Sequence, residues 1–264
     1  MKTGTLGMTM RYLQFRRRCK PKHGYGVHSP FVFDLLMQVI EPDPRMAPFE
    51  PIERYRYTLK HSAERIHRQP IDGVMEPSIA LRRLAQHVAI PPHMGRLLYR
   101  LCLYAQPKNI VELGTSVGIS TLYMAAAAPS CPIHTIEAEP NVLSIAQKQF
   151  KHLGYNNIHT HQGTFAQQLP PLLDEVPSVG IALIDGHHHG PAVVGYTEQL
   201  INKASPSTII VLDDIRWSRS METAWQHLCA HPDVRLSIDL FRCGLLLFRQ
   251  GMAKQHFALR FGPY

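Results

Sequence analysis

The chain of 264 residues is long enough for one large α/β domain with an extension, or for two small domains. Hydrophobic residues make up 45% of it and charged residues 18%, a globular composition that excludes an intrinsically disordered chain. An excess of 28 Lys and Arg over 20 Asp and Glu gives a net charge of +8, which suits anionic partners.

The N-terminal segment concentrates this positive charge. Six of the basic side chains that precede Asp34, the first acidic residue, are Arg11, Arg16, Arg17, Arg18, Lys20 and Lys22. Such a cluster is compatible with a nucleic-acid or anionic-membrane contact, but a solvated arm or helix face is the simpler interpretation. No apolar run approaches the ~18–20 residues that span a bilayer, and no signal-peptide core is recognisable. We therefore expect no membrane span.

The cysteines are scattered along the chain and odd in number: Cys19, Cys102, Cys131, Cys229 and Cys243. They form no CxxC pair, so the sequence indicates neither a disulfide framework nor a zinc ribbon. We expect a reducing, cytoplasmic setting.

Residues 1–106 carry helical patterns separated by loops and rich in proline. Ser29 is expected to cap a helix that begins at Pro30 in HSPFVFDLLMQVI. Further helices are expected over residues 51–68, 77–88 and 91–105.

From residue 108 onward, short β-branched runs alternate with helical patterns. Strands are expected at residues 109–114, 132–137, 157–163, 179–185 and 207–214. This alternation predicts a parallel sheet with helices on both faces. The last two runs, residues 234–240 and 243–249, are joined by a link too short for a parallel crossover, so they predict an antiparallel hairpin. The fold class is therefore α/β, with a seven-stranded, mostly parallel sheet whose last strand is antiparallel.

The first strand of this sheet ends in the sequence VELGTSVGIS. Gly114 and Gly118 allow a tight turn into a helix N-terminus, where backbone N–H groups favour an anion. The dinucleotide fingerprint GxGxxG is not satisfied, and an ordinary strand–helix turn is the alternative. Glu137 ends the second strand at about the ~20-residue spacing of a ribose-binding acid. Together the two features favour a nucleoside site.

These segments, with HQGTF, LIDGHHH and VLDDI, resemble the class I S-adenosylmethionine-dependent methyltransferases, and most of all the small-molecule O-methyltransferases of the catechol, caffeoyl-CoA and macrocin types. The resemblance covers about residues 90–250. It implies a Rossmann-like fold, a methyltransferase domain at residues 107–250, a helical cap at residues 1–106 and a tail at residues 251–264.

The resemblance also implies a set of cofactor-binding residues. Glu112, Gly114, Ser116 and Gly118 would border the methionine part of S-adenosylmethionine, with the Ser120 hydroxyl near its carboxylate. Glu137, with Ala138 beside it, would accept from the ribose hydroxyls. The adenine would lie between Gly163, Thr164 and Phe165. Ser116 stands where many members of the wider superfamily have glycine.

Asp185 ends the fourth strand, beside the position that the resemblance assigns to the transferable methyl group. Methyl transfer to a hydroxyl needs alignment and deprotonation, by a hard divalent ion or by a base that titrates near neutrality. DGHHH is similar to the DGxH pattern of the macrocin type, which makes His188 the candidate base. His187 and His189 are expected to fill the loop.

Asp213 and Asp214 follow the fifth strand, on the same sheet edge as Asp185. Three carboxylates there suit Mg²⁺, whereas a helix N-cap is the alternative for the Asp213–Asp214 pair. The catechol type has a lysine at the place of His188 and an asparagine at that of Asp214, so its metal mechanism does not carry over directly. Trp217, shortly after, is either a substrate-facing aromatic or a core residue.

The predicted function is methyl transfer from S-adenosylmethionine to a hydroxyl of a small molecule. Amino-methyltransferases typically carry an NPPY-like turn where this chain has IDGH. The N-terminal helices would shape the acceptor pocket, and HGYGVHSPF, with His23, Tyr25, His28 and Phe31, is either a lid or a packing segment. The alternatives are an RNA methyltransferase that uses the basic arm, a catalytically silent nucleoside-binding module and, with less support, an NAD-linked dehydrogenase.

Overall fold

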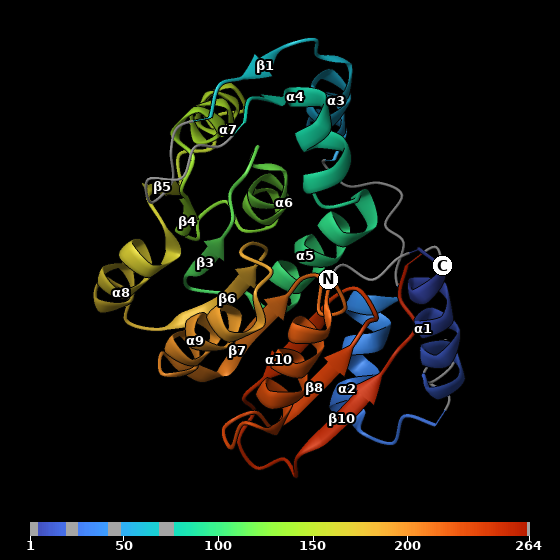
Figure 1. The fold of residues 1–264 in the computed structure, drawn as a ribbon. Helices are drawn as coiled ribbons and strands as arrows, with labels where there is room; N and C mark the ends of the chain where they lie inside the picture. The colour runs from blue at the N-terminus through green and yellow to red at the C-terminus, as the bar shows by residue number, and fades with distance from the viewer. Residues whose placement is uncertain (1–4, 20–25, 42–48, 69–76, 263–264) are drawn as a thin grey trace. The chain divides into compact units, whose positions relative to one another are not determined.

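A computed structural model describes residues 5–19, 26–41, 49–68 and 77–262 (Figure 1). The chain folds into two compact units, one formed by Met1–Pro42 with Pro177–Tyr264 and the other by Asp43–Val176. The boundaries predicted at residues 106 and 250 stay predictions. Among the described residues, no helix has both the length and the apolar character that a membrane crossing requires.

The unit of residues 43–176 contains three parallel strands, β3 (Ile110–Leu113), β4 (Ile133–Glu137) and β5 (Ile158–Gln162). Each is followed by a helix: α6 (Ile119–Ala127), α7 (Pro140–His152) and α8 (Phe165–Glu175). Strand β3 is buried over its whole length, including Glu112, as is typical of a parallel strand covered on both faces. This confirms the predicted alternation of strands and helices.

The N-terminal part of the same unit is helical: α3 (Glu50–His61), α4 (Leu81–Arg83), the π-helical turn η3 (Leu84–Val88) and α5 (Pro92–Ala105). Helix α5 packs against α6 so closely that a Cβ on Gly95 would lie 2.3 Å from the Tyr123 ring. The helix expected over residues 51–68 is shorter in the structure, where α3 ends at His61. Beyond it, β1 (Arg65–Ile66) pairs with β2 (Ile79–Ala80), which also delays the start of the helix expected at residue 77.

The unit of residues 1–42 and 177–264 holds five strands: β6 (Val179–Ile184), β7 (Ala204–Leu212), β8 (Leu236–Asp239), β9 (Gly244–Leu247) and β10 (Gln255–Ala258). β6 and β7 are parallel, whereas β9 is antiparallel to both β7 and β8. The predicted hairpin is therefore confirmed. Strand β10 adds to β8 in parallel within the predicted tail, so the described residues hold eight strands from β3 to β10, one more than predicted.

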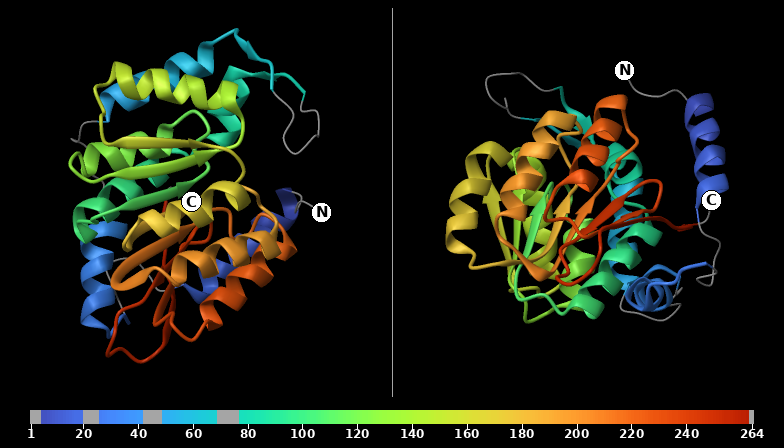
Figure 2. Two further views of the ribbon diagram at one scale, coloured as in Figure 1. Left: turned by 90° about the vertical axis from the view of Figure 1, so that its left-hand side faces the viewer. Right: turned by 90° about the horizontal axis from the view of Figure 1, so that it is seen from below.

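The helices of this unit are α1 (Thr5–Arg18), α2 (Pro30–Leu35) with the π-helical turn η2 (Leu36–Ile40), α9 (Gly190–Ile201) and α10 (Arg219–Ala230). Figure 2 shows α9 and α10 on one face of the strands and α2 on the other. The Ser29 hydroxyl accepts from the Val32 amide, which confirms the predicted cap. Phe31 lies 4.4 Å from the Arg249 guanidinium carbon, a packing contact, whereas His23, Tyr25, Lys20 and Lys22 lie outside the described residues.

Candidate functional site

The glycine turn lies between β3 and α6 and has an unusual backbone. Gly114, Ser116 and Gly118 all have positive φ, at 112°, 47° and 80°. A Cβ on Gly118 would lie 2.5 Å from the Phe150 ring, so this position requires glycine both for its backbone and for its packing. Ser116 is a non-glycine residue in the left-handed region, which is costly unless the surroundings hold it there.

Glu112 is fully buried at the end of β3. Its Oε2 accepts from Thr121, at 2.5 Å, and from Thr135, at 2.6 Å, whereas its Oε1 has no hydrogen-bond partner among the described residues. Burial raises the pKa of Glu112 to about 7, although the hydroxyls of Ser120, Thr121 and Thr135 lower it. The result is a buried carboxyl with one oxygen that has no hydrogen-bond partner among the described residues, an arrangement that favours a cationic or hydrogen-bonding ligand.

Glu137 lies at the end of the neighbouring strand β4. Its Oε2 accepts from the Ser116 amide at 2.9 Å and its Oε1 from the Glu139 amide at 3.0 Å. These bonds orient the carboxylate and hold the strained Ser116 backbone, which explains how a serine is tolerated there. Burial raises the pKa of Glu137, and the amides of Glu139, Ser116 and Ala138 counter this.

The end of β5 completes the set. Gly163, with φ 145°, donates its amide to the Glu137 carbonyl at 3.0 Å. Thr164 begins α8 with a capping box to Gln167, and Phe165 is the first helical residue. The structure therefore brings all the predicted nucleoside residues to the carboxyl ends of three adjacent strands, where open α/β sheets bind ligands. Their binding roles stay predictions.

A tyrosine from α3 supports the glycine turn and was missed by the sequence analysis. The buried Tyr55 hydroxyl donates to the carbonyl of Val117, inside the turn, at 3.0 Å. The two residues are 62 positions apart, and the helical pattern around Tyr55 shows only that it faces inward. No sequence signal distinguishes it from a core residue.

The loop after β6 carries Asp185 and the three histidines. His187 adopts φ 52° and its Nδ1 lies 3.2 Å from the hydroxyl of Tyr196 in α9, so its ring contacts that helix. The Nε2 of His188 lies 3.9 Å from the Oδ2 of Asp214, and its ring centroid is 5.4 Å from that of Trp217. His188 is thus the histidine that faces the loop after β7.

The loop after β7 contains a buried ion pair that the sequence analysis also missed. Both oxygens of Asp213, which is 1% exposed, accept from Arg242, with Nε–Oδ1 at 3.0 Å and Nη2–Oδ2 at 2.8 Å. The same Nη2 lies 3.5 Å from the Oδ1 of Asp214. Burial alone lowers the pKa of Arg242. The nearby carboxylates have the larger combined effect and raise this pKa overall, Asp213 most and then Asp214 and Asp185. Burial and Asp213 raise the pKa of Asp214 to about 6.

The predicted magnesium ligands do not fit a metal ion in this arrangement. The Arg242 guanidinium binds both oxygens of Asp213 and lies 3.5 Å from Asp214, so a cation of the chain already occupies the place beside these carboxylates. In the part of the chain that the structure describes, no group of three or more His, Cys, Asp or Glu side chains is arranged to hold a metal. The alternative role of Asp213–Asp214 as a helix cap is also corrected, because the Ser218 hydroxyl caps α10 through the Met221 amide.

The residues of the glycine turn, in contrast, fit the methionine part of S-adenosylmethionine. Two buried polar atoms there, Glu112 Oε1 and Ser116 Oγ, have no hydrogen-bond partner among the described residues. Buried polar groups are rarely left unpaired in native proteins. A ligand with a positive charge and hydrogen-bonding groups would pair both.

Comparisons with known proteins point to methyltransferases. Residues 111–215 match the model of a family described as "Methyltransferase domain". The chain is 30% identical over 131 residues to a catechol O-methyltransferase of Niastella koreensis, which covers 48% of this chain and 58% of the relative. It is 33% identical over 81 residues to the release factor glutamine methyltransferase of Escherichia coli, which covers 26% of this chain and 29% of the relative. The chain thus spans less than two thirds of either relative.

A solved structure shares the fold. The O-methyltransferase TomG of Streptomyces achromogenes, in complex with SAM, superposes with a TM-score of 0.58 at 18% identity, covering 83% of this chain and 95% of that one. The comparisons confirm the predicted fold class and the resemblance to class I methyltransferases.

Proposed function

We propose that the protein is an S-adenosylmethionine-dependent methyltransferase that transfers a methyl group to a hydroxyl of a small molecule. The observation that carries this proposal is the pair of buried polar atoms without partners, Glu112 Oε1 and Ser116 Oγ, on a glycine turn beside Glu137. The matched methyltransferase model begins at residue 111, one position before Glu112. The two lines of support are independent, since one is geometric and the other rests on sequence.

The cofactor would be held by the unit of residues 43–176. Glu112 and Ser116, with the N-terminus of α6, would bind the methionine part, and Glu137 would accept from the ribose hydroxyls. Each Glu137 oxygen accepts one amide and keeps a further acceptor site for a hydroxyl. When bound, S-adenosylmethionine would supply an electrophilic methyl carbon on its sulfonium for transfer to a hydroxyl oxygen, with S-adenosylhomocysteine as the leaving group.

The acceptor chemistry is assigned to the loops after β6 and β7. The His188 imidazole would take the proton of the acceptor hydroxyl, since imidazoles titrate near neutral pH. Asp214, 3.9 Å from the His188 Nε2, would stabilise the resulting imidazolium once ionised. Asp185 would orient the hydroxyl. No step runs through Mg²⁺, because Arg242 already pairs with the carboxylates that would bind it.

The first test is calorimetric titration with S-adenosylhomocysteine. We expect micromolar binding that Glu137→Ala and Glu112→Gln each weaken at least tenfold. Glu175→Ala, an exposed carboxylate at the end of α8, serves as the matched control and should leave the affinity unchanged. Absence of binding to the unaltered protein would overturn the proposal, and binding of NAD in its place would favour a dehydrogenase.

The second test identifies the acceptor class. Cell extract is incubated with the protein and methyl-labelled S-adenosylmethionine, either untreated or after digestion with RNase or with protease. A small hydroxyl acceptor predicts label in the low-mass fraction after both digestions. Loss of label after RNase would instead establish the RNA alternative, and loss after protease a protein acceptor of the kind named for the E. coli relative.

A further inference from the structure

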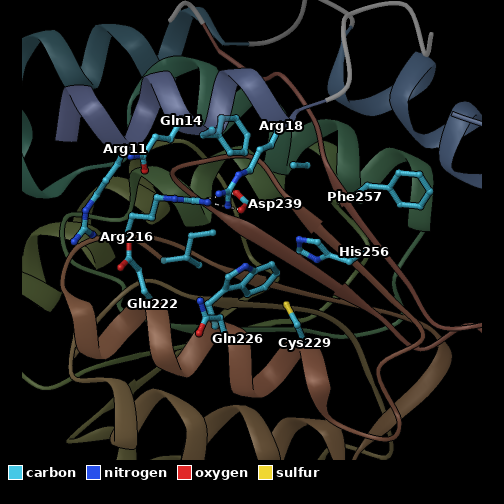
Figure 3. Close-up of a pocket in the computed structure, with 14 residues that line it drawn as sticks. Arg11, Gln14, Arg18, Arg216, Glu222, Gln226, Cys229, Asp239, His256 and Phe257 are labelled. Carbon is cyan, nitrogen blue, oxygen red and sulfur yellow. Dashed lines mark hydrogen bonds and ion pairs between the residues drawn. The ribbon is translucent and has the colours of Figure 1, made fainter. Parts of the chain in front are cut away.

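A cavity of about 710 Å³ lies within the unit of residues 1–42 and 177–264, on one side of α10 (Figure 3). Its walls come from α1, from the segment between β7 and α10, from α10 itself and from strands β8 and β10. The side chains that line it are Arg11, Gln14, Phe15, Arg18, Ile215, Arg216, Glu222, Trp225, Gln226, Cys229, Asp239, His256, Phe257 and Ala258. Ligand pockets of small molecules commonly measure ~300–1,000 Å³.

This cavity is separate from the proposed active site. None of the residues assigned to the cofactor lines it, and neither do Asp185, His188, Asp213 or Asp214. A ligand here would therefore be an additional one.

The cavity lining contains more arginines than carboxylates, and two of these arginines are paired with acidic side chains. Arg216 is bound through both terminal nitrogens to Asp239 and lies beside the rings of Phe15 and Phe241, with its guanidinium carbon 5.2 and 5.0 Å from their centroids. Arg11 pairs with Glu222 at 2.5 Å. Two of the three arginines are thus neutralised inside the wall.

Arg18 supplies the remaining charge. It is exposed at the end of α1, and no acidic side chain of the described residues pairs with it. Burial lowers the pKa of His256, more than Asp239 raises it, so this imidazole adds little positive charge at neutral pH. The lining therefore carries a net charge of about +1 near its α1 side, which attracts one negative group.

The cavity also has an apolar and aromatic part, to which α1 contributes Phe15 and α10 contributes Trp225. Trp225, 6% exposed, and Phe15, 7% exposed, line the cavity together with Ile215 and Phe257. Aromatic side chains of this kind pack against flat apolar ligands. Gln14 and Gln226 are exposed and add hydrogen-bonding groups.

We propose that this cavity binds a small organic anion, with a flat apolar body against Trp225 and a single carboxylate, phosphate or sulfonate on Arg18. Figure 3 shows the side chains of α1 and those of α10 directed into the same space, as such a ligand requires. The site is independent of methyl transfer.

The test uses 8-anilinonaphthalene-1-sulfonate, an aromatic anion, in a Trp217→Phe background. Trp225 is then the only tryptophan, because the chain has two. We expect saturable, one-to-one quenching of Trp225 emission that Arg18→Gln weakens at least fivefold. Arg17→Gln, the adjacent exposed arginine that does not line the cavity, is the matched control and should change the affinity by less than twofold.

Two further titrations make the result specific. N-phenyl-1-naphthylamine has the same apolar body without the sulfonate, and should bind at least fivefold more weakly and be insensitive to Arg18→Gln. Saturating S-adenosylhomocysteine should not displace the sulfonate probe. Equal effects of Arg17→Gln and Arg18→Gln, equal affinity for the two probes, displacement by S-adenosylhomocysteine or absence of quenching would each overturn the proposal.

Discussion

At the scale of single residues, the buried carboxylates Asp213 and Glu112 differ in whether the chain itself pairs both of their oxygens. Asp213 is paired with a guanidinium within the chain, whereas Glu112 keeps an oxygen without a partner in the described structure. Removing one partner of a buried ion pair leaves an uncompensated charge and is strongly destabilising. A buried, unpaired carboxylate is itself a cost that a ligand can relieve. The first arrangement therefore favours stability, and the second is the one that we expect at a binding site.

The first prediction concerns Arg242. Arg242→Gln should lower the free energy of unfolding by about 3–5 kcal/mol, because Asp213 would stay buried without its partner. Arg235→Gln, an exposed arginine in the same unit, should change it by less than about 0.5 kcal/mol. Urea unfolding measures both.

The same pairing predicts weak metal binding. In Mn²⁺ titrations followed by electron paramagnetic resonance, the unaltered protein should show no site tighter than about 1 mM. A tighter site that is lost in Asp213→Asn would contradict the assignment of Arg242 as the cation that pairs with Asp213.

The second prediction follows from the raised pKa of Glu112. Burial raises it from 4.5 to about 7, so the folded state binds more protons than the unfolded state between these values. Stability without ligand should therefore fall as pH rises from about 4.5 to about 7, and Glu112→Gln should make this fall smaller, leaving the part that the raised pKa values of Glu137 and Asp214 contribute.

The shift corresponds to about 2–4 kcal/mol at pH 8, where Glu112→Gln should be the more stable protein while its affinity for S-adenosylhomocysteine is lower. Urea unfolding at pH 4 and pH 8 measures the difference, with the exposed Glu175→Gln as control. If Glu112→Gln is less stable than the unaltered protein at pH 8, or binds S-adenosylhomocysteine as tightly, the proposed role of Glu112 Oε1 in binding is disproved.

At the scale of elements, the patterns with a short period were predictable and the contacts between distant segments were not. The alternation of strands and helices, the β8–β9 hairpin and the Gly114–Gly118 turn all follow from local composition and link length. Arg242 meets Asp213 across 29 positions and Tyr55 meets Val117 across 62, so only the folded chain shows them. Strand β10 was missed because it is a four-residue, partly exposed edge strand without an apolar run.

The third prediction tests the element that supports the glycine turn. Tyr55→Phe removes the hydrogen bond from α3 to the Val117 carbonyl and should cost about 1–2 kcal/mol of stability. Since Val117 lies between Ser116 and Gly118, the affinity for S-adenosylhomocysteine should also fall several-fold. Tyr57→Phe, on the same helix and 64% exposed, should change neither quantity. Loss of stability with unchanged affinity would show that α3 contributes only to packing.

At the scale of the whole molecule, the proposed cofactor residues at the ends of β3, β4 and β5 lie in the unit of residues 43–176. The proposed base and its neighbour Asp214 lie in the other unit. Binding and turnover should therefore be separable by mutation. Variants of Glu112 or Glu137 should lose affinity and activity together, whereas variants of the base should lose turnover alone.

The fourth prediction is the sharpest form of this separation. His188→Gln removes the proposed base and should lower kcat by about 10²–10⁴-fold, the usual range for general-base catalysis, with unchanged affinity for S-adenosylhomocysteine. His187→Gln is the matched control: its ring lies against Tyr196 and not near Asp214, so kcat should change little. Calorimetry, and initial rates with an acceptor that the labelling experiment yields, measure the two quantities. Full activity of His188→Gln would remove this histidine from the chemistry, and loss of S-adenosylhomocysteine binding would assign it to the cofactor instead, because a residue that acts only on the acceptor cannot alter the affinity for a nucleoside it does not touch.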